Sequence, residues 1–205
     1  MNHLAIFGAS GHGRVIADAA ALCGWKKISF FDDDETKNEQ KLHWPFLGSF
    51  FKLLENIENF DGVIVGIGNN LIRHDKYIKI SQKGGKIVSV IHPMAIISKY
   101  SSIGNGSVIF ANSVVNAGAQ IGDFVILNTA STIDHDCKIG DASHISPGAN
   151  LAGGVIVGSK TWVGIGACIK QNIKIGENVV IGAGAVVVKD LPDNVLAIGN
   201  PAKIK

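Results

Sequence analysis

The 205-residue sequence predicts two domains of different class, a small α/β domain followed by a parallel β-helix. Three observations lead to this fold class. A six-residue repeat fills the second half of the chain, short β-rich runs alternate with helical patterns in the first ninety residues, and Pro93 stands between the two patterns. We place the domains at residues 1–92 and 93–205.

Composition excludes several classes of protein. Hydrophobic residues make up 46% of the chain and charged residues 18%, which is typical of a globular protein with a large core. A net charge of +2 gives no reason to expect a nucleic-acid partner. No apolar run approaches the ~20 residues of a membrane span, and residues 1–7 lack the basic segment and cleavage site of a secretory signal. We therefore expect a cytoplasmic protein without a membrane partner.

The first domain contains short β-rich runs with helical segments between them. The expected strands are Leu4–Phe7, Ile28–Phe31, Val63–Val65 and Val88–Ile91. A helix is expected over Gly11–Cys23, where apolar residues recur at helical spacing and Gly24 follows as a C-cap. A second helix is expected over Asn70–Gln82, before Gly84. Strands that alternate with helices indicate parallel βαβ units.

Three turns of this domain follow its strands and face one crevice. Residues 8–13, Gly-Ala-Ser-Gly-His-Gly, lie between a strand and a helix, where glycines and free helical N–H groups favour a phosphate. Asp32 and Asp33 follow the second strand, where a carboxylate often meets a ribose hydroxyl, and residues 66–70 follow the third. The alternatives are a tight turn without a ligand and a solvated acidic loop. Together the turns predict a nucleotide-type ligand.

The second domain is defined by aliphatic residues at every sixth position. These lead residues are Ile97, Ile103, Ile109, Val115, Ile121, Leu127, Ile133, Ile139, Ile145, Leu151, Val157, Val163, Ile169, Ile175, Ile181 and Val187. The residue four places after a lead is usually small, and glycine directly follows seven of the leads: Gly104, Gly122, Gly140, Gly158, Gly164, Gly176 and Gly182. Neither helical spacing nor simple alternation produces this pattern.

A triangular coil explains the repeat, because each hexad then supplies one short strand and one corner. The lead and the small residue point inward and stack on their equivalents in the next coil. We expect the glycines to supply corner conformations with positive φ. Sixteen hexads make a little over five coils, and a spacing of about 4.8 Å per coil gives a prism roughly 25 Å long.

Chemistry in such a prism must come from side chains that point outward. His135 should project outward, with Asp136 beside it, and a second histidine, His144, follows nine residues later. A histidine next to a carboxylate suits a general base, because the carboxylate fixes the tautomer and raises the imidazole pKa. The alternative is an ordinary surface histidine. Cys137 falls at an inward position, which favours packing over a nucleophilic role. The histidines have no third ligand at useful spacing, so no metal is expected.

The whole chain resembles the bacterial sugar acetyltransferases that join a nucleotide-binding βαβ domain to a hexapeptide β-helix. It is similar to N-acetyltransferases of UDP-linked 4-amino-4,6-dideoxy sugars on the route to bacillosamine, to perosamine N-acetyltransferases and to sialic acid O-acetyltransferases. The motifs that carry the resemblance are residues 8–13, 32–33, 67–70, 127–130, 133–137, 143–146 and Gly199–Lys203.

The resemblance implies a fold and a set of site residues. The first domain would be Rossmann-like and the prism left-handed, and family members are homotrimers with active sites between neighbouring prisms. His135 would be the general base and Asp136 its partner, where relatives often have glutamate. Residues matching the sugar-nucleotide site are Ser10, Gly11, His12, Asp32, Asp33 and Gly68. His144, Ile165 and Ala183 would line the acetyl-CoA channel, and lysines 160, 170, 174, 189, 203 and 205 could meet the CoA phosphates.

The resemblance predicts acetyl-CoA-dependent N-acetylation of a nucleotide-linked amino sugar, with UDP as the nucleotide. Three alternatives stand beside it. O-acetylation of a sugar hydroxyl uses the same base chemistry. A non-catalytic nucleotide-sugar-binding scaffold would keep the fold without turnover, although the His135–Asp136 pair argues against it. An NAD-binding domain is disfavoured by the small size of the first domain and by its incomplete fingerprint.

Overall fold

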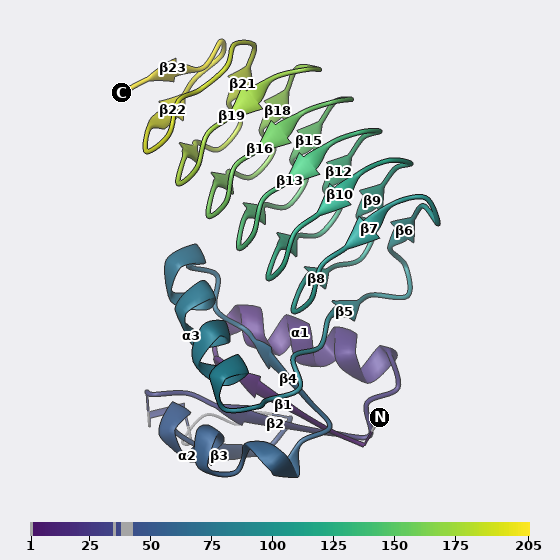
Figure 1. The fold of residues 1–205 in the computed structure, drawn as a ribbon, viewed down its shortest axis with the longest axis vertical. Helices are drawn as coiled ribbons and strands as arrows, with labels where there is room; N and C mark the ends of the chain where they lie inside the picture. Colours follow the sequence, from purple (N-terminus) through teal and green to yellow (C-terminus); the bar gives the residue numbers. More distant parts are fainter. Residues whose placement is uncertain (1, 35, 38–42) are drawn as a thin grey trace. The chain divides into compact units, whose positions relative to one another are not determined.

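The computed structural model describes residues 2–34, 36–37 and 43–205, and the chain divides into two compact units, Met1–Pro93 and Met94–Lys205. Figure 1 shows the α/β elements of the first unit and the stacked coils of the second. Each unit is described by itself below.

The first unit is built on a parallel sheet with strand order β3-β2-β1-β4. Its strands are β1 His3–Phe7, β2 Lys27–Phe31, β3 Phe46–Gly48 and β4 Gly62–Val65. All four residues of β4 and the last four of β1 and β2 are buried, which explains their continuous apolar character. The chain therefore extends the sheet from β1 toward β2 and β3, and then returns to place β4 on the other edge of β1.

Helices connect these strands. They are α1 Gly11–Leu22, α2 Phe50–Glu55, a 3₁₀ helix at Ile57–Asn59 and α3 Asn70–Gln82, and a short strand, β5 Val90–Ile91, packs on α1. The parallel βαβ arrangement predicted from the alternation of strand and helix is confirmed.

The helix ends follow from local chemistry. The chain leaves α1 through Gly24, which has φ +88° and so occupies the conformation that the sequence predicted for a glycine C-cap. Helix α2 begins after Ser49, whose Oγ accepts a hydrogen bond from Lys52 N. Helix α3 begins after Asn69, whose Oδ1 accepts from Ile72 N at 3.0 Å.

The sequence missed strand β3, helix α2 and the 3₁₀ helix Ile57–Asn59 of this unit, and it overestimated the length of strand β5. Strand β3 and helix α2 contain three and six residues, which is too short for a hydrophobic period to be visible. The strand expected over Val88–Ile91 begins only at Val90, while Ile87 forms a single parallel bridge to Val63.

The second unit is a parallel β-helix of two-residue strands, each of which ends on a lead residue. The strands are β6 Ile96–Ile97, β7 Ser102–Ile103, β8 Val108–Ile109, β9 Val114–Val115, β10 Gln120–Ile121, β11 Ile126–Leu127, β12 Thr132–Ile133, β13 Lys138–Ile139, β14 His144–Ile145, β15 Asn150–Leu151, β16 Ile156–Val157, β17 Trp162–Val163, β18 Cys168–Ile169, β19 Lys174–Ile175, β20 Val180–Ile181 and β21 Val186–Val187. Two further strands, β22 Leu196–Ile198 and β23 Lys203–Ile204, pair antiparallel after the last hexad.

The strands form three faces of a triangular prism, visited in turn by every coil. We name them the first face (β8, β11, β14, β17, β20, β22, β23), the second face (β6, β9, β12, β15, β18, β21) and the third face (β7, β10, β13, β16, β19). From β6 to β21, each strand pairs in parallel with the strand 18 residues away, as Ile133 does with Val115 and Leu151. Figure 1 shows the coils stacked from teal to yellow along the chain.

The interior of the prism is filled as the repeat predicts. The lead residues and the residues four places later form one continuous hydrophobic cluster, in which Cys137 is fully buried. Polar members of the inward rows are satisfied by the neighbouring coil, since Ser107 Oγ donates to Gly122 O at 3.0 Å and Thr161 Oγ1 donates to Gly176 O at 2.8 Å. These buried hydroxyls therefore bridge neighbouring coils.

The expectation that the glycines after the leads have positive φ is wrong. Positive φ occurs instead three residues after a lead, at Asn112, Phe124 and Asp136 among others. A Cβ at Gly158 would lie 2.5 Å from the carbonyl carbon and oxygen of Gly176, in the next coil. A Cβ would lie equally close to backbone atoms of the next coil at Gly104, Gly140, Gly164 and Gly176, so the distance between coils requires glycine at these places.

None of the helices among the described residues is both long and apolar enough to cross a membrane.

Candidate active site

The candidate general base is the exposed pair His135 and Asp136, in the turn between β12 and β13. This turn is the vertex between the second and third faces. Nδ1 of His135 lies 2.8 Å from Oδ2 of Asp136, and the two side chains are 63% and 73% exposed. An ionised carboxylate only accepts hydrogen bonds, so Nδ1 carries the proton and Nε2 keeps its lone pair. Asp136 has φ +60°, a conformation that aspartate tolerates better than most residues.

Electrostatics make this imidazole more basic. The hydrogen bond from Nδ1 to Asp136 and then the negative charge of Asp134 raise the pKa of His135 above its ordinary value of 6.5. Because the side chain is 63% exposed, a ligand can reach the imidazole. The pair therefore has the geometry and the proton affinity of a general base.

A second carboxylate holds the backbone of the same turn. Oδ1 of Asp134 accepts from His135 N at 2.8 Å and from Asn116 Nδ2 at 2.9 Å. These hydrogen bonds, with that of Asn116 the larger contribution, lower the pKa of Asp134. Sequence reasoning missed Asn116 and Asp134. The available signal was their separation of 18 residues, which is one full coil.

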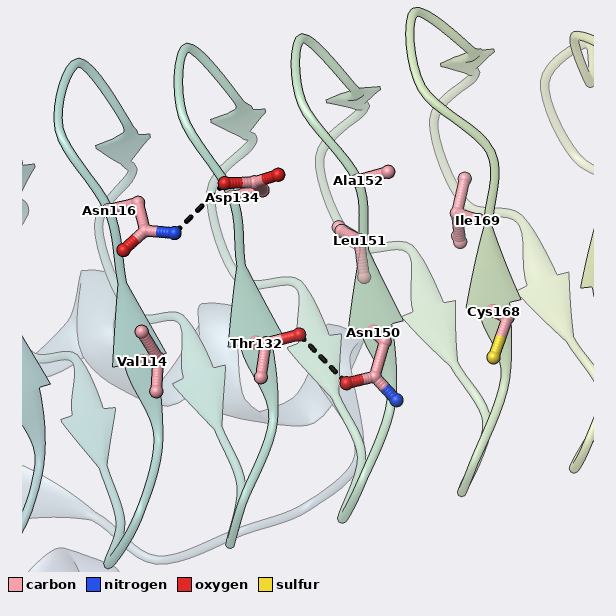
Figure 2. Close-up of a pocket in the computed structure, with 9 residues that line it drawn as sticks. All are labelled: Val114, Asn116, Thr132, Asp134, Asn150, Leu151, Ala152, Cys168 and Ile169. Atoms are coloured by element: carbon pink, nitrogen blue, oxygen red, sulfur yellow. Dashed lines mark hydrogen bonds between the residues drawn. The ribbon is translucent and has the colours of Figure 1, made fainter.

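A pocket of about 470 Å³ with both polar and apolar lining residues lies on the second face beside this turn. Figure 2 shows Asn116, Asp134, Thr132 and Asn150 on successive coils around it, with Thr132 Oγ1 donating to Asn150 Oδ1 at 2.8 Å. Its carboxylate and amide groups can hydrogen-bond a hydroxylated ligand.

A second pocket, of about 430 Å³, lies on the first face and brings together three residues that the sequence singled out. His144, Ile165 and Ala183 line it, together with Trp162. The rings of His144 and Trp162 stack with centroids 5.6 Å apart and an angle of 7° between their planes. The lining is mostly apolar, with the imidazole at one end.

Hydrogen bonds fix the ring of His144. Asn128 Oδ1 accepts from Thr129 N at 2.9 Å, so its amide nitrogen faces His144 Nε2 at 3.2 Å. Trp162 Nε1 donates to Ser146 Oγ at 2.8 Å. Sequence reasoning missed Trp162, although it stands 18 residues after His144 and pairs with it in register.

The structure separates the two histidines that the sequence placed half a coil apart. His144 lies on the first face, whereas His135 lies at the vertex between the other two faces. In a triangular prism this vertex is opposite the first face, so the core of the prism lies between His135 and the pocket of the same chain. One chain cannot present both to the same small ligand.

In the first unit, the turns after β1 and β4 meet at the point where the strand order reverses, which is where open α/β sheets bind ligands. Gly8 has φ +114°, and a Cβ there would lie 2.6 Å from Gly66 O, so the fold requires this glycine. Gly11 and Gly68 differ, because a Cβ on either would meet nothing within 4 Å. The packing of the domain therefore does not require glycine at these two positions, and the space beside them is open.

The neighbouring carboxylates both have protein partners. Asp32 Oδ2 accepts from Ala9 N at 2.8 Å and so holds the first turn. Asp33 Oδ1 accepts from Phe50 N at 2.9 Å, and its Oδ2 pairs with Lys76 Nζ at 3.0 Å. Burial opposes ionisation of Asp33, but these two contacts outweigh it and lower its pKa. Asp32 thus fixes the turn after β1, and Asp33 links this region to α2 and α3.

Ser10, His12 and Arg73 complete the crevice. Ser10 is the exposed N-cap of α1, and its side chain makes no capping hydrogen bond. Arg73 is buried and donates through Nη1 to Ile67 O and Gly68 O at 3.1 and 2.9 Å, which fixes the turn after β4. Burial, with a smaller effect of the Arg73 charge, lowers the pKa of His12 to about 4. His12 is therefore neutral near pH 7.

Two other predicted features can be placed. The Cys137 thiol is buried, donates to Ala152 O at 3.2 Å and has a pKa raised by burial, as suits packing better than nucleophilic attack. Among the residues that the structure describes, no group of three His, Cys, Asp or Glu side chains is placed to hold a metal ion.

Comparisons with known proteins place the chain in a family. The family model described as the PglD N-terminal domain matches residues 3–80, and that of the bacterial transferase hexapeptide matches residues 154–189. The acetyltransferase domain of PglB from Neisseria gonorrhoeae is 42% identical, with 99% of each chain covered and a TM-score of 0.93. Perosamine N-acetyltransferase from Caulobacter crescentus, solved with CoA and GDP-perosamine, is 38% identical, with 99% of this chain and 96% of that chain covered and a TM-score of 0.95.

The chain belongs to the bacterial nucleotide-sugar acetyltransferases of the hexapeptide-repeat class. The resemblance drawn from the motifs is confirmed, and so is the fold class, a Rossmann-like domain followed by a left-handed parallel β-helix. A curated member of this acetyltransferase family, UDP-N-acetylbacillosamine N-acetyltransferase of Bacillus subtilis, is 35% identical over 114 residues. That match covers 54% of this chain and 52% of the relative, so it spans about half the length of the curated protein.

Proposed function

We propose that this protein transfers the acetyl group of acetyl-CoA to the amino group of a nucleotide-linked 4-amino-4,6-dideoxy sugar, with UDP as the nucleotide. The observation that carries the proposal is the exposed His135–Asp136 pair, in a chain whose relatives are named as N-acetyltransferases of nucleotide-linked amino sugars. We expect it to act in the cytoplasm, where acetyl-CoA is available, in the synthesis of a bacterial surface glycan or glycoprotein.

The reaction is direct transfer with His135 as general base. The sugar nitrogen attacks the thioester carbonyl and forms the N–C bond of the amide, while Nε2 of His135 takes one of its protons. The C–S bond then breaks, and the leaving thiolate receives a proton to become free CoA. The Asp136 hydrogen bond orients the imidazole and stabilises its protonated form. A positioned base of this kind contributes roughly 10²- to 10⁴-fold.

The pocket on the first face fits the arm of acetyl-CoA. Its apolar lining of Trp162, Ile165 and Ala183 suits the pantetheine chain, and the buried His144 offers one polar contact at its end. A solved PglB acetyltransferase domain from Neisseria gonorrhoeae holds acetyl coenzyme A, and it is 41% identical to this chain with a TM-score of 0.92. These observations support the assignment of this pocket to the cofactor.

The crevice of the first unit fits the nucleotide sugar. The N-terminus of α1 offers free N–H groups to a phosphate, and the open space at Gly11 and Gly68 lets a ligand approach the backbone. We assign Ser10, His12, Asp32 and Asp33 to the same ligand. The solved relative with GDP-perosamine supports a nucleotide sugar as the class of acceptor.

We propose a homotrimer, and the position of His135 opposite the pocket of its own chain supports a site shared between protomers. The base of one protomer must then serve the pocket of a neighbour. A face that meets a vertex is a head-to-tail contact, and such contacts close into a ring when the rotation permits. Three copies around an axis, with three equivalent sites, are the arrangement that we propose.

The first experiment measures thiol release from acetyl-CoA with UDP- and dTDP-4-amino-4,6-dideoxy sugars, GDP-perosamine and free sialic acid as acceptors. Release with the UDP-amino sugar is expected. Release only with sialic acid would replace N-acetylation by O-acetylation. Binding of a nucleotide sugar without thiol release from any acceptor would instead support a scaffold.

The assignment of the base is tested with His135→Ala. We expect kcat to fall by about 10²- to 10⁴-fold while the affinity for CoA, measured by calorimetry, is unchanged. A folded variant with wild-type turnover would remove His135 from the mechanism.

A further inference from the structure

The imidazole of His135 lies directly on a glycine of the next coil. Gly153 stands 18 residues after His135, at the same place in the following coil. A Cβ built on Gly153 would lie 2.5 Å from Cε1 of His135 and closer still to Nε2. The Cε1–Nε2 edge of the ring therefore occupies the space in which any other residue would carry its side chain.

The coil itself does not require glycine at this place. Gly153 has no positive φ, and the positive φ of this turn belongs to Gly154. The same place in the neighbouring coils of this vertex holds Ala117 and Gln171, both exposed. Across the sixteen hexads, residue 153 is the only glycine two places after a lead. The backbone of the prism therefore accepts a side chain there.

We propose that Gly153 is a positioning residue for the base. Because Gly153 has no side chain, its backbone forms a platform on which the imidazole of His135 lies. Two contacts then define the ring. Asp136 holds the Nδ1 edge at 2.8 Å, and Gly153 supports the opposite edge, which carries Nε2. The inference rests on the proposed role of His135 and adds what holds its reactive nitrogen in place.

The platform matters because the base is exposed. A histidine that is 63% exposed has few neighbours to restrict its rotamer, so the two contacts have to select the conformation. A misplacement of about 1 Å of a reacting group can lower a rate by about 10²-fold. The energetic effect on folding is small, because the atoms that meet the new methyl group belong to a side chain that can move.

The test is Gly153→Ala in the full-length protein. We expect kcat to fall by about 10²-fold, with the KM values of both substrates within about twofold of wild type and an unchanged Tm. NMR of the imidazole gives a readout that does not depend on turnover. The His135 signals should shift, and its pKa should fall toward 6.5, because the ring leaves Asp136 when the methyl group displaces it.

Gln171→Ala is the matched control, since it changes the same place one coil further on, and it should leave kcat and the His135 signals unchanged. An unchanged kcat or unmoved His135 signals in Gly153→Ala would overturn the platform. A raised KM with an unchanged kcat would overturn it as well, because the methyl group would then only obstruct a substrate. Full activity of His135→Ala would instead overturn the proposed base, while the NMR of Gly153→Ala would still report whether the ring lies on residue 153.

Discussion

At the scale of single residues, the reactivity of His135 depends on one short contact at the surface. The hydrogen bond to Asp136 contributes most to its raised pKa, and the charge of Asp134 adds to it. The base must be neutral to accept a proton. Activity should therefore decline as the pH falls through a pKa that lies above 6.5.

Replacement of Asp136 by asparagine tests this contact. The pKa of His135 should fall, so the acid limb of the kcat/KM profile should move to lower pH. The plateau should be lower by roughly 10-fold or more, because the weaker base also loses its fixed tautomer. Steady-state kinetics between pH 5.5 and about 9 would measure both effects. An acid limb that stays in place would mean that it reports another group.

The pKa of His12 is shifted in the opposite direction from that of His135, and it links the stability of the first unit to pH. Its pKa of about 4 in the folded chain lies below the ordinary 6.5, so between these values the unfolded chain binds a proton that the folded chain does not. The contribution of His12 to the free energy of unfolding is therefore highest above pH 6.5. It decreases as the pH falls toward 4, by up to about 3 kcal/mol. Urea unfolding at pH 7 and pH 4.5 should show a smaller loss in His12→Gln than in wild type, and equal losses would contradict the assignment.

At the scale of the elements, the prism shows two separate uses of glycine. Positive φ occurs at the third residue after a lead, where asparagine, aspartate and even Phe124 also occur. The position directly after a lead requires glycine for another reason, which is the short distance between coils. Gly158 is the clearest example, because its added Cβ would meet only backbone atoms of Gly176 and Glu177.

Gly158→Ala should therefore destabilise the prism by about 1–3 kcal/mol, because the coils cannot separate locally without losing hydrogen bonds. Gly153→Ala is a matched comparison, since the same methyl group there meets only the movable ring of His135. Thermal unfolding followed by circular dichroism should show a lower Tm for the first variant and no change for the second. Equal Tm values would mean that coil spacing does not require the glycine.

At the scale of the whole molecule, the separation of the base from the pocket predicts complementation between inactive chains. His135→Ala removes the base, and Ala183→Trp fills the pocket on the first face. In trimers formed from equal amounts of both variants, a site is intact when an Ala183→Trp chain supplies the base and a His135→Ala chain supplies the pocket. Random mixing makes about one quarter of the sites intact.

Co-expression of the two variants should therefore restore about a quarter of wild-type turnover, whereas each variant alone is inactive. Size-exclusion chromatography of each variant alone controls for assembly. If mixed trimers recover no turnover, the base and the pocket of each site come from the same chain. That result would contradict a site shared between protomers.

The sequence determined the architecture and most of the chemistry. Sixteen unbroken hexads are sufficient for a prism, because a repeat of six with inward aliphatics fits no other regular structure. The same register assigned Cys137 to the core and placed His135 outside it. The turn Gly8–Gly13 was recognisable because its glycines lie between a strand and a helix, which is a local feature of the chain.

Tertiary structure decided what depends on contacts between coils and between strands. The 18-residue register brings Asn116 to Asp134, Trp162 to His144 and Gly153 beneath His135, and nothing within a single hexad shows which residue of the next coil it meets. The reason for the glycines after the leads was also misjudged from sequence, because φ is a local property whereas the distance between coils is not. A linear pattern specifies which side of the chain faces inward, but only the closed coil specifies what lies next to it.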